Sequence, residues 1–255
     1  MKPIALITGA TSGIGEATAL LLAKNNYNII ITGRRKERLL LLQEKITAET
    51  DAQVMALNFD IRSLPENEAA INRLPEEWQN IDVLVNNAGL AAGFNTFQEG
   101  VVDDWERMID TNIKGLVYIT RLISPKMIER GSGHIINISS VAGKETYPFG
   151  NVYCASKHAV QSLTKGMRID MLKHGIKVSS ISPGAVETEF SEVRFKGDKS
   201  RAKQVYKGIT PLNAHDIADT ILFIVTRPKH VNIDDILITP TDQAYSRDFN
   251  RREID

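Results

Sequence analysis

Short apolar runs rich in branched side chains recur along the chain, separated by longer stretches of mixed polarity. Seven of these runs are predicted strands, at residues 4–8, 28–32, 53–59, 82–86, 134–139, 177–182 and 235–240. Near-continuous apolar runs are typical of strands buried on both faces of a sheet. Between most of them apolar residues recur at helical spacing, as at Ala17, Leu20 and Leu21. Alternating strands and helices predict parallel βαβ units.

The pattern therefore indicates an α/β protein with one doubly wound, seven-stranded parallel sheet and helices on both faces. One stretch, at about 184–215, departs from the alternation and is polar, reading SEVRFKGDKSRAK at 191–203. It follows the sixth strand and so leaves the sheet at its carboxyl edge, where open α/β sheets bind ligands. We expect a substrate lid there; the alternative is a solvated surface excursion.

The composition argues against several classes of binding partner. The formal net charge is zero, which argues against nucleic acid and membrane surfaces, because both normally attract a basic excess. No apolar run approaches the length of a membrane span, and the first residues do not resemble a signal peptide. The single cysteine, Cys154, excludes an internal disulfide and suits the cytoplasm. The five histidines show no metal-ligand spacing, so no metal is expected.

The first strand runs into TGATSGIG at residues 8–15. Glycines allow a tight turn in which backbone N–H groups approach a pyrophosphate at the positive end of a helix. A glycine-rich turn used only for packing is the alternative. The cofactor-binding residues predicted in this loop are Gly9, Thr11, Ser12, Gly13, Ile14 and Gly15.

The second strand ends in ITGRRKER, with no acidic residue at its end and with Arg34 and Arg35 directly after Gly33. An acid at this position binds the ribose 2′-hydroxyl of NAD, whereas an arginine meets the 2′-phosphate of NADP. Because a guanidinium matches a phosphate in charge and geometry, we predict NADP(H) as the cofactor. The alternative is that these cations are only the solvated start of a helix.

The stretch NVYCASKHAV places Tyr153 and Lys157 four residues apart, on one face of a predicted helix. A free phenol has a pKa of about 10, too high for an efficient base near neutrality. An ammonium group one helical turn away favours the phenolate and lowers that pKa. The spacing therefore predicts Tyr153 as a general acid/base and Lys157 as its electrostatic partner.

Further motifs accompany this pair in order: NNAG at 86–89, TNIKG at 111–115 inside a predicted helix, INISS at 136–140 and SPGAVET at 182–188. Together with the glycine loop they closely resemble the classical short-chain dehydrogenase/reductase family, over nearly the whole chain. The resemblance implies a single-domain Rossmann fold over residues 1–255, and a nicotinamide-dependent enzyme that is commonly a homotetramer.

The resemblance also implies roles for individual residues. Ser140 orients the substrate oxygen, and is preferred to Ser139 because the family's serine lies thirteen residues before the tyrosine. Asn112 organises a proton relay to Lys157, which with Tyr153 also binds the cofactor. The remaining cofactor residues are Asp60 and Ile61 at the adenine, Asn86, Ala88 and Gly89 between adenosine and nicotinamide, and Pro183, Gly184, Val186 and Thr188 at the carboxamide.

For the substrate, VETEFSEVRFKGD at 186–198, AKQVY at 202–206 and YPFGNVY at 147–153 resemble the NADP-dependent serine or 3-hydroxy acid dehydrogenase subgroup. That subgroup oxidises L-allo-threonine, L-serine and 3-hydroxypropionate, and reduces malonic semialdehyde. A substrate carboxylate favours a cation in the pocket, and Arg194 is our candidate, with Lys196 as its competitor; the alternative is that both face water.

Two other functions stay open. One is a 3-oxoacyl or bulky-ketone reductase of the same family, against which the polar lid argues. The other is a catalytically silent NADP-binding regulator, against which the complete set of Asn112, Ser140, Tyr153 and Lys157 argues.

Overall fold

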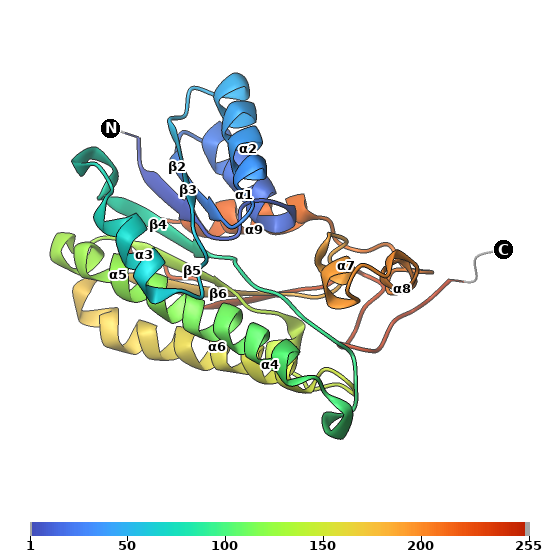
Figure 1. The fold of residues 1–255 in the computed structure, drawn as a ribbon. Helices are drawn as coiled ribbons and strands as arrows, with labels where there is room; N and C mark the ends of the chain where they lie inside the picture. Colours follow the sequence, from blue (N-terminus) through green and yellow to red (C-terminus); the bar gives the residue numbers. More distant parts are fainter. Residues whose placement is uncertain (1, 253–255) are drawn as a thin grey trace.

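The computed structural model describes residues 2–252 and contains one seven-stranded sheet (Figure 1). Its strand order is β3-β2-β1-β4-β5-β6-β7, and every neighbouring pair is parallel. The strands are β1 (Ile4–Ile7), β2 (Asn28–Gly33), β3 (Val54–Asn58), β4 (Ile81–Asn86), β5 (His134–Ile138), β6 (Lys177–Pro183) and β7 (Asp235–Ile238). The direction of winding reverses between β1 and β4, so the predicted doubly wound fold and all seven predicted strands are confirmed.

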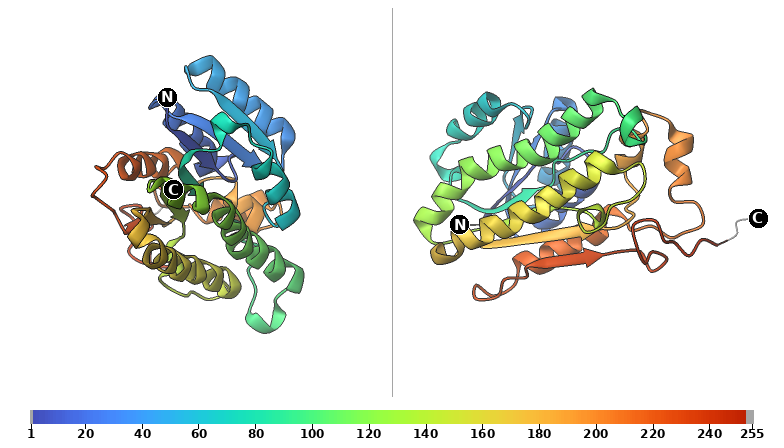
Figure 2. Two further views of the ribbon diagram at one scale, coloured as in Figure 1. Left: turned by 90° about the vertical axis from the view of Figure 1, so that its left-hand side faces the viewer. Right: turned by 90° about the horizontal axis from the view of Figure 1, so that it is seen from below.

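Helices cover both faces of the sheet (Figures 1 and 2). One layer contains α1 (Gly13–Lys24), α2 (Lys36–Glu49) and α9 (Ala214–Val225). The other contains α3 (Leu64–Asn72), α4 (Val102–Ile109), α5 (Leu116–Arg130) and α6 (Asn151–Met171). Short 3₁₀ turns lie at Glu76–Trp78, Phe97–Glu99, Val141–Gly143 and Leu172–His174. No helix within residues 2–252 is both long and apolar enough to cross a membrane.

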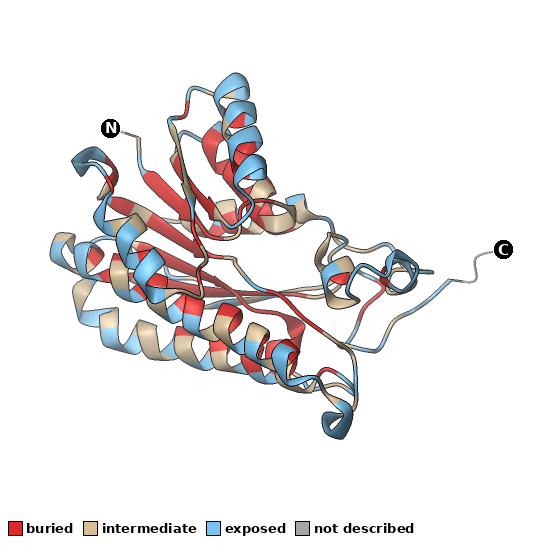
Figure 3. Ribbon diagram, in the orientation of Figure 1, coloured by how far each residue is buried: buried red, intermediate tan, exposed pale blue. Residues whose placement is uncertain are grey.

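The core consists of two apolar layers, one on each face of the sheet. Along β1, Ala5 and Ile7 pack into the cluster that includes α1, α2 and α9, whereas Ile4 and Leu6 point to the opposite face. The five inner strands are buried over most of their length (Figure 3), which explains their continuous apolar sequence. The edge strands β3 and β7 are only partly buried. Burying each large side chain contributes about 1.5–3 kcal/mol, so the sheet is a rigid platform for the residues at its carboxyl edge.

The junction between α4 and α5 differs from the predicted helix. Residues Asp110–Gly115 form a π-helical turn, which contains the TNIKG motif. The turn comes close to the loop after β3, since a Cβ added at Gly115 would lie 3.0 Å from Cγ2 of Ile61. Such wide turns inside α-helices are frequent at functional sites.

The polar 184–215 segment lies beyond the carboxyl edge of the sheet, where Figure 1 shows it in orange. It contains two short helices, α7 (Phe190–Arg194) and α8 (Lys199–Gln204). It returns to the fold through a bridge between Val186 and Leu212 before α9 begins.

Candidate active site

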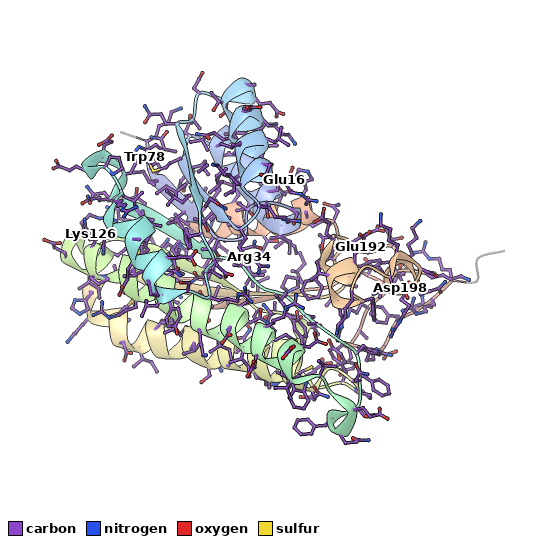
Figure 4. The ribbon with its side chains drawn as sticks, in the orientation of Figure 1. Glu16, Arg34, Trp78, Lys126, Glu192 and Asp198 are labelled. Atoms are coloured by element: carbon purple, nitrogen blue, oxygen red, sulfur yellow. The ribbon has the colours of Figure 1, made fainter. Side chains whose placement is uncertain are left out.

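A cleft of about 810 Å³ lies between the carboxyl edge of the sheet and the 184–215 segment. Figure 4 labels Arg34 at the edge of the sheet, and Glu192 and Asp198 on the segment opposite. The predicted site residues that line the cleft are Gly9, Thr11, Ser12, Gly13, Ile14, Arg34, Arg35, Asp60, Ile61, Ala88, Gly89, Ser140, Tyr153, Lys157, Pro183, Gly184, Val186, Thr188 and Arg194. The topology therefore gathers residues from all along the chain at one edge.

Two predicted cofactor residues do not line the cleft. A Cβ added at Gly15 would lie 2.5 Å from Nδ2 of Asn87, so Gly15 allows α1 to pack closely against the end of β4. Asn86 is buried, and its Nδ2 donates to Oγ1 of Thr120 at 2.9 Å and Oδ1 of Asn137 at 2.8 Å. Its side chain points into the polar interior below the sheet edge, whereas the neighbouring Asn87 lines the cleft. The cofactor role of Asn86 stays a prediction.

The glycine loop forms a cradle that fits a phosphate group. Gly9 and Gly13 adopt positive φ angles of 65° and 56°, which favour glycine. A Cβ at Gly9 would lie 2.8 Å from Cα of Ala88, so a side chain there would close the approach. Ser12, the N-cap of α1, makes no side-chain cap bond, which leaves the N–H groups at the positive end of this helix available to an anion.

Three arginines gather beside this cradle. Arg35 is fixed by the loop, donating from Nε and Nη2 to Oγ1 of Thr11 at 3.0 and 2.7 Å and from Nη2 to Oγ of Ser12 at 2.8 Å. Arg34 is about half exposed and lies 3.8 Å from the Asp60 carboxylate. Arg38, which the sequence analysis missed, lies one helical turn from Arg35 in the RRKER motif, and that spacing could have revealed it.

Tyr153 and Lys157 are both buried on α6, with Nζ of Lys157 6.0 Å from the centre of the Tyr153 ring. Nζ donates to the Ile138 carbonyl at 2.9 Å. Burial raises the pKa of Tyr153 and lowers that of Lys157 to about 8, because low polarity disfavours the charged form of each. Ser140 and Arg194 oppose the raised tyrosine pKa.

The two serines after β5 make different contacts. Oγ of Ser140 accepts from the Ala142 N–H at 3.1 Å and donates weakly to the Pro183 carbonyl at 3.4 Å. Ser139 donates to the backbone carbonyl of Lys157 at 3.2 Å, which ties α6 to the sheet. Ser140 lines the cleft, and it acts to lower the pKa of Tyr153 against the effect of burial.

Asn112 lies behind the cleft lining, in the π-helical turn, and bridges two elements. Its Oδ1 accepts from the Leu90 N–H and its Nδ2 donates to the Leu90 carbonyl, both at 2.9 Å. Nδ2 also donates to Oγ of Ser156 at 3.0 Å, and that hydroxyl donates to the Tyr153 carbonyl at 2.7 Å. Asn112 therefore positions the start of α6 relative to the loop after β4.

Arg194 lies in the cleft among aromatic rings. Its Cζ is 4.8 Å from the ring centre of Phe94 and 5.5 Å from those of Tyr147 and Tyr153. Its Nη1 donates to the Tyr147 hydroxyl at 3.0 Å. Its Nε is buried and has no hydrogen-bond partner within residues 2–252. Arg194 is a partly buried residue, and a guanidinium with a buried, unpaired donor is suited to an anionic ligand.

Lys196, the competing cation, is engaged elsewhere. Its Nζ lies 2.8 Å from the carboxylate of the buried Asp104, and the residue is absent from the cleft lining within the described part of the chain. Of the two cations considered from the sequence, Arg194 therefore lines the cleft and Lys196 does not. The C-terminal segment also reaches the cleft, through Gln243, Ser246, Arg247, Phe249 and Arg251, which the sequence analysis did not anticipate.

Known proteins resemble this chain over nearly all its length. The family model for short chain dehydrogenases matches residues 3–199. The NADP-dependent 3-hydroxy acid dehydrogenase YdfG of Salmonella typhi is 44% identical over 244 residues, 95% of this chain and 97% of that protein. Sulfoacetaldehyde reductase 2 of Chromohalobacter salexigens is 43% identical over 247 residues, 96% and 97% of the two chains. The closed form of a serine dehydrogenase complexed with NADP+ aligns with a TM-score of 0.92 and 42% identity, over 98% of this chain and 100% of that chain.

Proposed function

The chain belongs to the short-chain dehydrogenase family, and from that premise we propose that it is an NADP(H)-dependent oxidoreductase acting on small 3-hydroxy acids. The reaction interconverts the hydroxyl and carbonyl forms of substrates such as L-allo-threonine, L-serine and 3-hydroxypropionate, the last paired with malonic semialdehyde. The observation that carries the substrate class is Arg194, a guanidinium with a buried unpaired Nε, 5.5 Å from the Tyr153 ring.

The residues of the cleft fit NADP(H). The glycine loop and the open start of α1 suit the pyrophosphate, and the fixed guanidinium of Arg35, with Arg34 beside it, suits the 2′-phosphate. The dehydrogenase of Salmonella typhi is named as NADP-dependent, and the serine dehydrogenase was solved with NADP+. When bound, the nicotinamide supplies or accepts the hydride. The residues proposed around its other parts are Asp60, Ile61, Ala88, Gly89, Lys157, Pro183, Gly184, Val186 and Thr188.

Tyr153 exchanges the proton of the substrate oxygen. Burial holds its phenol in the protonated form, which is the form required of an acid when a carbonyl is reduced. For oxidation the phenolate has to form, and Ser140 and Arg194 oppose its raised pKa. Ser140 also orients the substrate oxygen. Lys157, charged below a pKa of about 8, supports the proton transfer, and Asn112 holds the helix that carries both residues.

Arg194 binds the substrate carboxylate. Its ring neighbours, Phe94 and Tyr147, surround the guanidinium with apolar surface, which strengthens an ion pair formed there. Loss of one partner from a desolvated, hydrogen-bonded charge pair costs about 2–5 kcal/mol of binding free energy. The 184–215 segment that carries Arg194 is accordingly proposed as the substrate lid. The predicted homotetramer and cytoplasmic location stay predictions.

The test follows NADPH absorbance with L-serine, L-allo-threonine, 3-hydroxypropionate, and a bulky uncharged ketone. We expect turnover with the acids. Tyr153→Phe should reduce kcat at least about a hundredfold and retain NADPH binding. Arg194→Gln should raise KM for the acids about thirtyfold or more. An unchanged KM removes Arg194 from the substrate site, and preference for the bulky ketone refutes the substrate class.

A sulfonate is a second candidate for the anionic group. The relative from Chromohalobacter salexigens is named as a sulfoacetaldehyde reductase, and a guanidinium binds tetrahedral as well as planar oxyanions. Sulfoacetaldehyde reduction with NADPH therefore belongs in the same substrate panel, where a higher kcat/KM for it than for malonic semialdehyde favours this alternative.

A further inference from the structure

Three charged side chains join the start of the lid to the cofactor side of the cleft. The carboxylate of Glu189 accepts from Nη1 of Arg35 at 2.9 Å and from Nη1 of Arg38 at 2.7 and 2.8 Å. Glu189 is the N-cap residue of α7, whereas the two arginines lie at the start of α2. The contact therefore connects segments more than 150 residues apart in the sequence.

The other end of α7 is joined to the opposite side of the cleft. Lys196 contacts the Asp104 carboxylate at 2.8 Å, and the Gly93 N–H donates to the Arg194 carbonyl at 3.1 Å. Arg194 thus lies between two attachment points. Both attachments belong to the segment whose guanidinium lies 5.5 Å from the Tyr153 ring.

We propose that Glu189 and Arg38 are positioning residues, which hold the lid across the cleft and keep Arg194 in place for the substrate anion. This inference rests on the proposed function. Arg35 takes part in the same contact while also donating to Thr11 and Ser12. The lid is therefore attached to the arginine assigned to the 2′-phosphate, so cofactor recognition and substrate recognition share one set of charges.

The geometry distinguishes this contact from an ordinary surface ion pair. The side chains of Glu189, Arg35 and Arg38 are 42–44% exposed, and isolated exposed pairs contribute at most about 1 kcal/mol. Here one carboxylate accepts from two guanidinium groups, one of which is already fixed by the glycine loop, so little additional side-chain order is lost. Glu187, on the same segment, forms no ion pair within residues 2–252 and offers a matched control.

The experiment compares Glu189→Gln, Arg38→Gln, their double variant and the control Glu187→Gln. With NADP+ and L-serine, each of the first two should raise KM about three- to fivefold, with kcat within about twofold of wild type. The double variant should be no worse than the more affected single variant, because both changes break the same contact. The control should match wild type.

Hydrogen exchange of residues 190–204 gives a second measurement, made on the protein without substrate. Exchange should be about threefold faster in both single variants and unchanged in the control. Equal exchange in Glu189→Gln and wild type, or faster exchange with an unchanged KM, overturns the proposal, as do multiplicative effects in the double variant. Failure of the proposed function would instead appear as a wild-type enzyme inactive on every anionic substrate, and the exchange result would then decide on the contact alone.

Discussion

Replacing Lys157 with methionine should have opposite effects on turnover and on the stability of the fold. Lys157 is 5% exposed, and Nζ has the Ile138 carbonyl as its acceptor. Methionine has a similar length, fills the same space without a charge and tolerates irregular surroundings. We expect Lys157→Met to abolish turnover and to leave a chain at least as stable as wild type at neutral pH.

The magnitude follows from the pKa. Burial lowers the pKa of the Lys157 ammonium from 10.5 to about 8. Because each pKa unit corresponds to about 1.36 kcal/mol, burying the charge destabilises the folded chain by about 3 kcal/mol at neutral pH. Lys157→Met has no charge to bury and is therefore free of this destabilisation. It also leaves the Ile138 carbonyl without its donor, which costs about 1–2 kcal/mol. The net expectation is a gain of about 1–2 kcal/mol at pH 7.

The pH dependence isolates the charge. Below pH 8 both the folded and unfolded chains carry the proton on Lys157, so the penalty is complete. Between pH 8 and 10.5 the folded chain has released this proton while the unfolded chain still binds it, and the stability of wild type therefore rises with pH. The stability of Lys157→Met relative to wild type should therefore fall by about 2 kcal/mol between pH 7 and 9.5, which removes or reverses its advantage.

Urea unfolding of both proteins at these two pH values, at one fixed chain concentration, measures the difference. The unpaired Ile138 carbonyl lowers the stability of the variant by the same amount at both pH values, so it does not contribute to the change with pH. A difference that stays constant with pH, or a variant less stable than wild type by more than 2 kcal/mol at pH 7, would refute the reasoning.

Three further outcomes follow from single positions. Gly15→Ala should lower stability by about 1–3 kcal/mol in thermal unfolding, because its Cβ would lie 2.5 Å from Nδ2 of Asn87. Gly166→Ala, in the helix interior with no atom within 4 Å of the added Cβ, should instead raise stability by about 0.5–1 kcal/mol. Burial, aided by the charge of Lys177, lowers the pKa of His134 from 6.5 to about 3, so the folded chain excludes a proton that the unfolded chain binds. The neutral His134 therefore stabilises the fold above pH 6.5, and this contribution falls by about 1.4 kcal/mol for each pH unit below that. Between pH 7 and pH 5, the urea midpoint of His134→Gln should decrease less than that of wild type.

The sequence was informative wherever local pattern determines the structure. Strand β1 is apolar throughout because both of its faces are buried, and Tyr153 and Lys157 share a face because a helix repeats every 3.6 residues. The pairing of Glu189 with Arg38 has no such local signal, since it depends on how the lid folds back. The same holds for Asn86, whose side chain follows the polar interior beneath the sheet edge, and for the π-helical form of the turn that contains TNIKG.

Departures from ordinary local structure concentrate at the cleft. Ser63 caps α3 by accepting from the Glu66 N–H, as a serine at an N-cap usually does. Ser12 occupies the same position on α1, but its hydroxyl accepts from Arg35 at 2.8 Å and caps nothing. The helix thereby forgoes about 1 kcal/mol of capping, while its N–H groups stay free for an anion and the arginine is fixed beside them. The buried ammonium of Lys157 likewise lowers stability at the cleft. Local stability given up at one place is the pattern expected when a fold is selected for its site rather than for its own stability.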